Sequence, residues 1–318
     1  MPLNPQRVRC LLAAFALLLS TTITADAATA GSFSHDGRLR TYSLHIPPGQ
    51  GRQPVALVVA LHGGGGNGEL NAEQTGFNAL ADREGFIVVH PDGTGRRRPL
   101  LNALGKGRLY TWNAGTCCGY AAQQDIDDVG FLRSLVRVLS DRYPIDPARI
   151  YATGLSNGGM MSYRLACEAS DLFAAIGVVA GTQTAPHCQP AQAVSVLHIH
   201  GSADRNVLLG GGIGDKALDK TPKPPVREAI DFWTRANGTD RSPHREVRGN
   251  IEREIFDGGR DGSSVEFLLI KGAGHAWPGG RRLFDFLDEP SQELSATETV
   301  WAFFKAHPKR RDRVQGAR

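Results

Sequence analysis

The sequence predicts an α/β fold, in which one doubly wound and mostly parallel sheet forms a single domain. The apolar run at 55–61 is typical of a strand buried on both faces of a parallel sheet. Similar runs alternate along the chain with helical patterns, as in a doubly wound sheet. The 318 residues are 41% hydrophobic and 21% charged, which excludes a collagen, a coiled coil, a disordered chain and a multi-pass membrane protein.

Short apolar runs after residue 61 predict the other strands of the sheet, at 86–89, 150–153, 176–179, 194–199 and 265–270. Between them, an apolar stripe with spacings of 3 and 4 predicts a helix from Val129 to Tyr143, and a weaker stripe starts at Phe77. Ser295 and Glu298 form a capping box before a last helix. The stretch 210–225 has no periodicity, so we expect a lid or a substrate loop there.

The first 27 residues have the pattern of a secretory signal peptide. Arg7 and Arg9 precede an apolar run at 10–19, and small residues at 25–27 offer an A-x-A cleavage site, with a second site at 28–30. The run is too short to cross a bilayer, which takes about 20 apolar residues. An uncleaved anchor is the alternative. We therefore expect an exported protein, extracellular or periplasmic, without stable membrane insertion.

The charge distribution gives no support for a nucleic-acid partner. The whole chain carries a formal charge of +4, and the segment 309–318 alone carries +4 because it holds five basic residues and one acid, Asp312. The predicted domain at 28–308 is therefore close to neutral and offers no basic face to a phosphate backbone. We expect 309–318 to be a disordered basic tail.

Four cysteines follow the leader: Cys117, Cys118, Cys167 and Cys188. An even number in an exported chain predicts two disulfide bonds, and three pairings are possible. The adjacent pair can bond only through a strained ring, which is uncommon. We favour a bond between Cys167 and Cys188, which would join the end of a helix to a loop. No spacing of cysteine or histidine matches a metal motif, so we expect neither a metal nor a cofactor.

The pentapeptide GLSNG at 154–158 carries the clearest chemical signal. It lies between a predicted strand and a predicted helix, where G-x-S-x-G forms a sharp turn that exposes the serine hydroxyl. The flanking glycines give the turn room. The turn also places the N–H of Asn157 at the positive end of a helix, where it can stabilise an oxyanion. Ser156 is therefore a candidate nucleophile; an ordinary tight turn is the alternative.

A serine hydroxyl needs a base, and α/β-hydrolases supply an acid and then a histidine downstream of the serine. Asp204 follows the strand at 194–199, and His275 lies in a glycine-flanked loop after the strand at 265–270. Catalytic groups gather at the carboxyl edge of such a sheet. Taken alone, Asp204 is more typical of a turn and a lone histidine is usually structural. His198 and His200 alternate on a strand, so we expect them in the core or behind the site.

The glycine-rich segment LHGGGGN at 61–67 is a candidate for the other half of an oxyanion hole. Its glycines would let backbone N–H groups turn toward the serine. A phosphate cradle is the rival interpretation, but no Gly-Lys-Ser/Thr follows and no acidic residue ends the next strand. A flexible loop without function is the remaining alternative.

The chain resembles the secreted polyhydroxybutyrate depolymerase-like esterases, a family that overlaps with feruloyl and acetylxylan esterases of carbohydrate esterase family 1. Six ordered blocks carry the resemblance over residues 35–306: LHGGGGN, WNAGTCCG, DDVGFL, YATGLSNGGMMSYRLAC, HIHGSADRNV and GAGHAWPGG. It implies an α/β-hydrolase fold with Ser156 as nucleophile, Asp204 as acid and His275 as base. It also implies that Gly64 and Asn157 donate the oxyanion N–H groups. The family often has a cysteine where Thr239 stands, so one family disulfide is expected to be missing.

Three further groups of residues have a functional and a plainer interpretation. Trp112 and Trp277 are candidate pocket walls for an acyl chain or an aromatic acid, or else core tryptophans. The acids at 125, 127 and 128 could hold calcium, but we favour Asp127 or Asp128 as the cap of the helix that starts near Val129. The sequon at 237–239 matters only in a host that glycosylates.

Taken together, these residues predict a secreted serine esterase that works through a Ser-His-Asp triad and an acyl-enzyme. The expected partner is a small or oligomeric ester, and the resemblance implies a 3-hydroxybutyrate oligomer or a feruloyl or acetyl ester. No adsorption domain follows the catalytic blocks, which weakens the case for an insoluble polymer. An exported serine peptidase and an inactive binding protein on the same fold are the alternatives. The sequence leaves the oligomeric state open.

Overall fold

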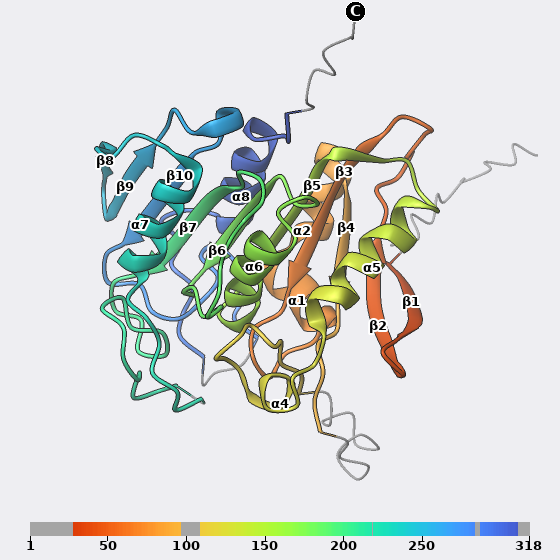
Figure 1. Ribbon diagram of the computed structural model, residues 1–318, viewed down its shortest axis with the longest axis horizontal. Helices are drawn as coiled ribbons and strands as arrows, with labels where there is room; N and C mark the ends of the chain where they lie inside the picture. Colours follow the sequence, from red (N-terminus) through yellow and green to blue (C-terminus); the bar gives the residue numbers. More distant parts are fainter. Residues whose placement is uncertain (1–27, 97–108, 218, 284–286, 311–318) are drawn as a thin grey trace, which may run out of the picture.

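A computed structural model describes residues 28–96, 109–217, 219–283 and 287–310. Its centre is a ten-stranded sheet in the order β1-β2-β4-β3-β5-β6-β7-β10-β9-β8 (Figure 1). The strands are β1 (Ala28–His35), β2 (Arg38–His45), β3 (Val55–Leu61), β4 (Ile87–Pro91), β5 (Ile145–Leu155), β6 (Ala175–Val179), β7 (Ser195–Gly201), β8 (His244–Arg248), β9 (Ile251–Phe256) and β10 (Val265–Ile270). The helices are α1 (Gly68–Thr75), α2 (Phe77–Glu84), α4 (Gly119–Gln123), α5 (Asp128–Ser140), α6 (Asn157–Glu168), α7 (Val226–Asn237), α8 (Ala296–Ala306) and the short 3-10 helix η1 (Arg260–Gly262). No helix within these described ranges is long and apolar enough to cross a membrane.

The predicted doubly wound sheet is confirmed in its central part. The strands β4, β3, β5, β6, β7 and β10 pair in parallel, and they are the six strands that the apolar runs predict. The outer strands β1, β2, β8 and β9 pair antiparallel and extend the sheet on both sides. The apolar runs do not predict these outer strands, because they are half-exposed and lack a continuous apolar run.

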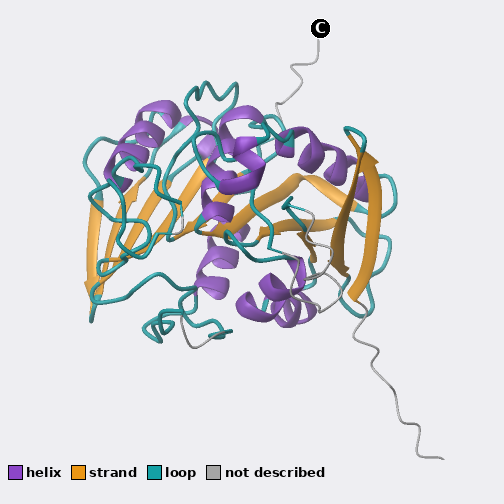
Figure 2. Ribbon diagram, turned by 90° about the horizontal axis from the view of Figure 1, so that it is seen from below, coloured by secondary structure: helices purple, strands orange, loops and turns teal. Residues whose placement is uncertain are grey.

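Two helical layers cover the sheet, one on each face (Figures 1 and 2). Alternate side chains of β3 show the division, since Leu57 and Val59 join the core under α5, α6 and α7, while Val58 joins the core under α2 and α8. This alternation explains why β3 is apolar at every position. All six central strands therefore present their carboxyl ends at one edge of the sheet, which is the lower edge in Figure 1.

The helix caps agree with the predictions. The Asp127 side chain accepts a hydrogen bond from the N–H of Gly130 at 2.8 Å and so caps α5. Asp128 instead forms a buried ion pair with Arg40 at 2.7 Å. The Ser295 hydroxyl accepts from the N–H of Glu298 at 3.3 Å and caps α8. Each cap satisfies an N–H that has no partner within its own helix.

The part of the chain that the structure describes contains two disulfide bonds, as the cysteine number predicts. Cys167 at the end of α6 is bonded to Cys188, the pairing that the sequence favours. Cys117 and Cys118 are bonded to each other, the pairing that is uncommon between adjacent cysteines.

The structure adds to two observations from the sequence, the start of the predicted tail and the sequon at 237–239. The predicted signal peptide at 1–27 and most of the predicted tail lie outside the described residues, but Lys309 is packed, because its backbone N–H donates to the carbonyl of Ala148 at 2.7 Å. The ordered domain thus continues past residue 308. The sequon asparagine, Asn237, is fully buried, and its side-chain amide bonds both backbone groups of Val194 at 3.2 and 2.7 Å. Its nitrogen is therefore not available to a glycan in the folded protein.

We predict that the double variant Cys167→Ala/Cys188→Ala loses about 3 kcal/mol of unfolding free energy, because the bond closes a loop with a sequence separation of 21. Urea denaturation followed by circular dichroism would measure the loss. The matched control is Cys117→Ala/Cys118→Ala. Its cysteines have a sequence separation of 1, so removing their bond changes the loop entropy of the unfolded chain very little. An equal loss in both variants would contradict this account.

Candidate active site

Ser156 forms the whole connection between β5 and α6. Its backbone angles are φ 56° and ψ −118°, a combination that costs free energy for a side chain other than glycine. Two hydrogen bonds hold it there: its N–H donates to the carbonyl of Val179 at 2.8 Å, and its carbonyl accepts from the N–H of Met160 at 2.9 Å. The predicted sharp turn between a strand and a helix is therefore confirmed, and its hydroxyl lies at the carboxyl edge of the sheet.

Close backbone contacts explain the glycines of the GLSNG turn. A Cβ at Gly158 would lie 2.3 Å from the carbonyl oxygen of Leu61, and a Cβ at Gly154 would lie 2.5 Å from the backbone of Gly158. Side chains at either position would push β3 and β5 apart. The glycines thus let the Ser156 turn press against the end of the neighbouring strand, where the glycine-rich loop begins.

The glycine-rich loop at 62–66 lies against this turn. The Cβ position of Gly63 is 3.7 Å from Cβ of Ser156, and that of Gly64 is 3.7 Å from Cβ of Asn157. Gly64 and Asn157, the two predicted oxyanion residues, are therefore neighbours. Asn157 is the first residue of α6, so its N–H lies beyond the reach of any carbonyl of that helix.

His62 fixes the shape of the glycine-rich loop. Its Nε2 accepts a hydrogen bond from the N–H of Gly93 at 3.0 Å, so its Nδ1 donates to the carbonyl of Gly63 at 2.8 Å. Burial lowers the pKa of His62 to about 4, which keeps the ring neutral and able to make both bonds. His62 is thus a structural group of the site, a role that sequence patterns did not indicate.

Asp204 and His275 meet across two loops, as predicted. Asp204 follows β7, and its Oδ1 accepts from the N–H groups of Asn206 and Val207 at 2.8 and 2.9 Å. Its Oδ2 accepts from Nδ1 of His275 at 2.7 Å. Burial would raise the pKa of Asp204, but the His275 hydrogen bond and the backbone N–H groups hold it below its ordinary value. The carboxylate is therefore charged and can only accept.

Within the described ranges, the structure shows the hydrogen bond between Asp204 and His275 but not the second hydrogen bond of a triad, from the serine hydroxyl to the histidine. Among the hydrogen bonds of the described residues, none joins the Ser156 hydroxyl to His275. Ser156 follows β5 and His275 lies in the loop after β10. These parallel strands are separated only by β6 and β7, so both residues lie at the carboxyl edge of the sheet. Contacts of this kind are often long in enzymes without substrate.

The two predicted pocket tryptophans are core residues instead. Both side chains have 0% exposure, so neither offers a face to a ligand. The Trp112 indole N–H donates to the carbonyl of His62 at 3.0 Å, and the Trp277 N–H donates to Thr297 at 2.9 Å. Their satisfied N–H groups and complete burial are typical of structural tryptophans, and the prediction that they line the pocket is wrong.

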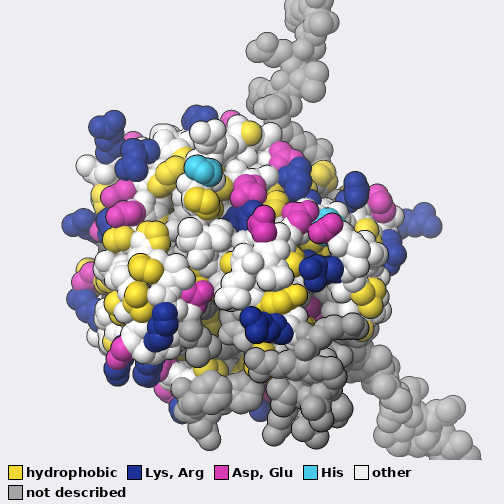
Figure 3. Space-filling view, turned by 60° about the horizontal axis from the view of Figure 1, so that its bottom comes forward, with side chains coloured by type: hydrophobic (Ala, Val, Ile, Leu, Met, Phe, Trp, Pro, Cys, Tyr) yellow, Lys and Arg dark blue, Asp and Glu magenta, His cyan; other side chains and the backbone are white. Residues whose placement is uncertain are grey.

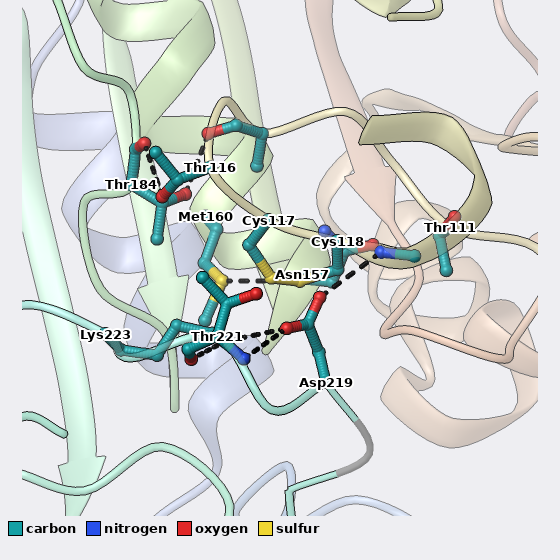
Figure 4. The surroundings of a disulfide bond; sticks show 12 residues. Thr111, Thr116, Cys117, Cys118, Asn157, Met160, Thr184, Asp219, Thr221 and Lys223 are labelled. Atoms are coloured by element: carbon teal, nitrogen blue, oxygen red, sulfur yellow. Dashed lines mark hydrogen bonds and ion pairs between the residues drawn. A yellow bond between two sulfur atoms is a disulfide. The ribbon is translucent and has the colours of Figure 1, made fainter. Parts of the chain in front are cut away.

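The side chain of Asn157 links the nucleophile turn to the segment at 112–118. Its Oδ1 accepts from the backbone N–H of Trp112 at 2.7 Å, and its Nδ2 donates to the same residue's carbonyl at 3.0 Å. The Cys117–Cys118 bond follows in this segment and contacts Met160 on α6, with the Sγ of Cys118 3.9 Å from the sulfur of Met160 (Figure 4). The segment is therefore fixed to the first turns of α6.

The stretch 210–225, the predicted lid or substrate loop, is bonded to neighbouring loops at the carboxyl edge of the sheet. Asp219 accepts from the N–H of Gly119 at 3.3 Å beside the disulfide bond (Figure 4). Lys216 pairs with Asp288 at 2.6 Å, and Asp288 accepts the backbone N–H of His275 at 2.9 Å. Figure 3 brings this edge forward and shows basic and acidic side chains next to one another on it. Through Lys216 and Asp288, the stretch 210–225 thus contacts the loop that holds His275, which supports its predicted role beside the site.

The three acids considered as calcium ligands have protein partners. Asp127 caps α5, and Asp128 bonds Arg40 and the backbone N–H of Asn113. Asp125 accepts from the side-chain amide of Asn113 at 3.1 Å.

Comparison with known proteins adds a family match and several relatives. The family model "Esterase PHB depolymerase" matches residues 40–237. "Putative esterase NocK" from Nocardia uniformis subsp. tsuyamanensis is 33% identical over 265 residues, which cover 77% of this chain and 72% of that protein. "Feruloyl esterase B" from Piromyces equi is 30% identical over 230 residues, which cover 69% of this chain but only 39% of that protein.

Among solved structures, the acetyl xylan esterase from Aspergillus awamori matches with a TM-score of 0.56 and 17% sequence identity. The match covers 78% of this chain and 94% of that chain. At this identity the likeness concerns the fold alone, and it agrees with the α/β-hydrolase arrangement of strands, turn and helices described above.

We predict that the buried His62 contributes a measurable part of the pH dependence of stability. Its pKa is about 4 in the folded chain, against an ordinary value of 6.5, so the unfolded chain binds more protons between these values. Stability from this group is complete above pH 6.5 and falls as the pH drops toward 4. For His62 alone, the unfolding free energy should fall by about 2 kcal/mol between pH 7 and pH 5.

Urea denaturation at both pH values would test this prediction with His62→Gln, which should lack that part of the pH dependence. The exposed His244 provides the matched control, because His244→Gln should keep the full dependence. An unchanged pH dependence in the His62 variant would contradict the assignment of a neutral, buried ring.

Proposed function

This chain belongs to the PHB depolymerase family of esterases, and from that premise we propose that it hydrolyses carboxylic esters through Ser156, His275 and Asp204. The hydrogen bond of 2.7 Å between Asp204 and Nδ1 of His275 carries this proposal. Because the charged Asp204 only accepts, Nδ1 holds the proton and Nε2 is left free. Nε2 is the nitrogen that has to take the proton of a serine hydroxyl.

The first step forms an acyl-enzyme. Ser156 Oγ attacks the ester carbonyl carbon while Nε2 of His275 takes the hydroxyl proton, and Asp204 stabilises the imidazolium that forms. The tetrahedral intermediate then collapses: the bond to the alcohol oxygen breaks, and His275 returns its proton to that oxygen. The products of this step are the free alcohol and an ester between the acyl group and Ser156.

Backbone N–H groups would stabilise the negative oxygen of the intermediate. Asn157 has an N–H at the positive end of α6, and Gly64 lies next to it on the loop that follows β3. Donors of this kind contribute about 3 kcal/mol each to the transition state. They require no movement if the turn and the loop keep the packing described above.

Hydrolysis of the acyl-enzyme repeats the chemistry with water. His275 takes a proton from water as its oxygen attacks the acyl carbon, and it then protonates Ser156 Oγ as the acyl bond breaks. The acid product leaves and the serine is restored. No cofactor takes part in this sequence of steps. We further propose, on the sequence pattern alone, that the enzyme acts after export and removal of residues 1–27.

The names of the family and of Feruloyl esterase B suggest two ester classes for this chain, 3-hydroxybutyrate oligomers and feruloyl esters. Both consist of a carboxylic ester that a serine can attack. The acyl group would lie near the segment at 112–118, which is bonded to Asn157 beside Ser156, and near the stretch 210–225, which is bonded to Gly119.

We predict that Ser156→Ala lowers kcat for ester hydrolysis by at least about a thousandfold and leaves the fold intact, because the variant removes the attacking oxygen alone. Purified protein without residues 1–27 would be assayed on 3-hydroxybutyrate oligomers and methyl ferulate, with the products identified by mass spectrometry. The exposed Ser140 at the end of α5 gives the matched control, since Ser140→Ala should keep full activity.

A Ser156→Ala variant that keeps more than about a thousandth of the activity would mean that another group attacks the ester. A peptide substrate cleaved faster than either ester would favour the peptidase alternative. If the wild-type protein hydrolyses nothing, the inactive binding protein is favoured.

A further inference from the structure

Three buried polar side chains behind the site form a chain of hydrogen bonds that the proposed mechanism does not use. The Tyr163 hydroxyl lies 2.8 Å from Nδ1 of His198, and Nε2 of His198 lies 3.1 Å from Nδ1 of His200. Nε2 of His200 then lies 2.8 Å from the carbonyl of Val207. All three side chains have at most 1% exposure.

The direction of every hydrogen bond in this series follows from the last acceptor, which is the carbonyl of Val207. A carbonyl only accepts, so the Nε2 of His200 carries a proton and donates to Val207. Burial lowers the pKa of both histidines, so each ring is neutral and has one bare nitrogen. His200 Nδ1 therefore accepts from His198 Nε2, and His198 Nδ1 accepts from the Tyr163 hydroxyl, whose pKa burial raises.

This series of hydrogen bonds connects the two halves of the proposed triad. Tyr163 lies on α6, the helix that begins directly after Ser156, while Val207 ends the turn that holds Asp204. His200 Nε2 also lies 3.5 Å from Oδ2 of Asp204, the same oxygen that accepts the His275 hydrogen bond. The backbone N–H of Val207 in turn donates to the other oxygen, Oδ1, at 2.9 Å.

A group of three polar side chains is costly at this place in the molecule. The rings pack against Trp233 and Phe267, with centroids 6.4 Å from Tyr163 and 5.7 Å from His198, so the surroundings are apolar. A polar atom left unpaired here would cost free energy, and replacing His200 alone by an apolar side chain would leave the Val207 carbonyl and the Nε2 of His198 without their partners. Part of the role of His200 is therefore structural, and its place beside Oδ2 of Asp204 points to a second role.

We propose that His200 is a positioning residue for the acid of the triad. By holding the Val207 carbonyl and lying beside Oδ2, it orients the Asp204 carboxylate toward His275, and the chain to Tyr163 sets the distance from α6. Asp204 can then support the proton on His275 that forms during attack. This inference rests on the proposed function of Ser156, Asp204 and His275.

The test compares His200→Leu with the conservative His200→Gln by steady-state ester hydrolysis. The leucine cannot donate, so we expect kcat to fall by about tenfold or more while KM stays within about twofold. Glutamine can donate an N–H to Val207 from nearly the same place, so we expect it to recover kcat to within about threefold of wild type. Circular dichroism and urea denaturation would establish that each variant is folded.

A double-mutant cycle with Asp204→Asn separates positioning from a purely structural role. If His200 acts through Asp204, then His200→Leu should cause almost no further loss of kcat in the Asp204→Asn background. Should the leucine variant fail to fold, Tyr163→Phe takes its place, because it removes only the hydroxyl that begins the chain. We expect about a threefold to tenfold loss of kcat for Tyr163→Phe, again absent in the Asp204→Asn background.

Folded variants with kcat within about twofold of wild type, or losses that simply add to that of Asp204→Asn, would overturn the proposal. Failure of the proposed function gives a different result, since either Ser156→Ala would then remain active or the wild-type protein would hydrolyse no ester, whatever the His200 variants do.

Discussion

The left-handed turn at Ser156 is the constraint on which the rest of the site depends. One residue has to reverse the chain between β5 and α6, and it does so with a φ of 56° while its backbone bonds Val179 and Met160. A turn this tight fits beside β3 only because Gly154 and Gly158 lack side chains. The same packing brings the glycine-rich loop against Ser156 and sets the N-terminus of α6 beside it. Ser156, the proposed nucleophile, and the proposed oxyanion donors Gly64 and Asn157 are therefore positioned by one local feature of the backbone.

Polar contacts between loops hold the remaining groups in place. The loops that follow β7 and β10 are joined by the Asp204–His275 hydrogen bond and by a bond of 2.9 Å from the N–H of Ala203 to the carbonyl of Ala273. Gly201 permits this approach, because a Cβ there would lie 2.3 Å from the Ala273 oxygen. Loops from different strands thus form one bonded unit, so a change in one of these loops would shift the position of His275. The stretch 210–225 joins this unit through the ion pair between Lys216 and Asp288.

Much of the fold could be predicted because buried parallel strands leave continuous apolar runs. The placement of Ser156, Asp204 and His275 at the carboxyl edge of the sheet could be predicted because each follows such a run. The edge hairpins could not, because half-exposed antiparallel strands such as β8 have no comparable pattern. Local sequence also does not show which tryptophans are buried: Trp112 and Trp277 lie beside motif residues but point into the core. The role of His62 depends on Gly93, and that of Asn237 on Val194, which are contacts distant in sequence.

The central claim is that Ser156 is an activated nucleophile, and covalent labelling tests it most directly. Wild-type protein would be treated with a fluorophosphonate, a probe that reacts with activated serines, and the modified peptide would be identified by mass spectrometry. The account predicts one adduct, on Ser156, that is absent in Ser156→Ala and forms more slowly in Asp204→Asn, because His275 then loses the carboxylate that orients it. An adduct on another residue, or no adduct on a folded protein, would contradict the account.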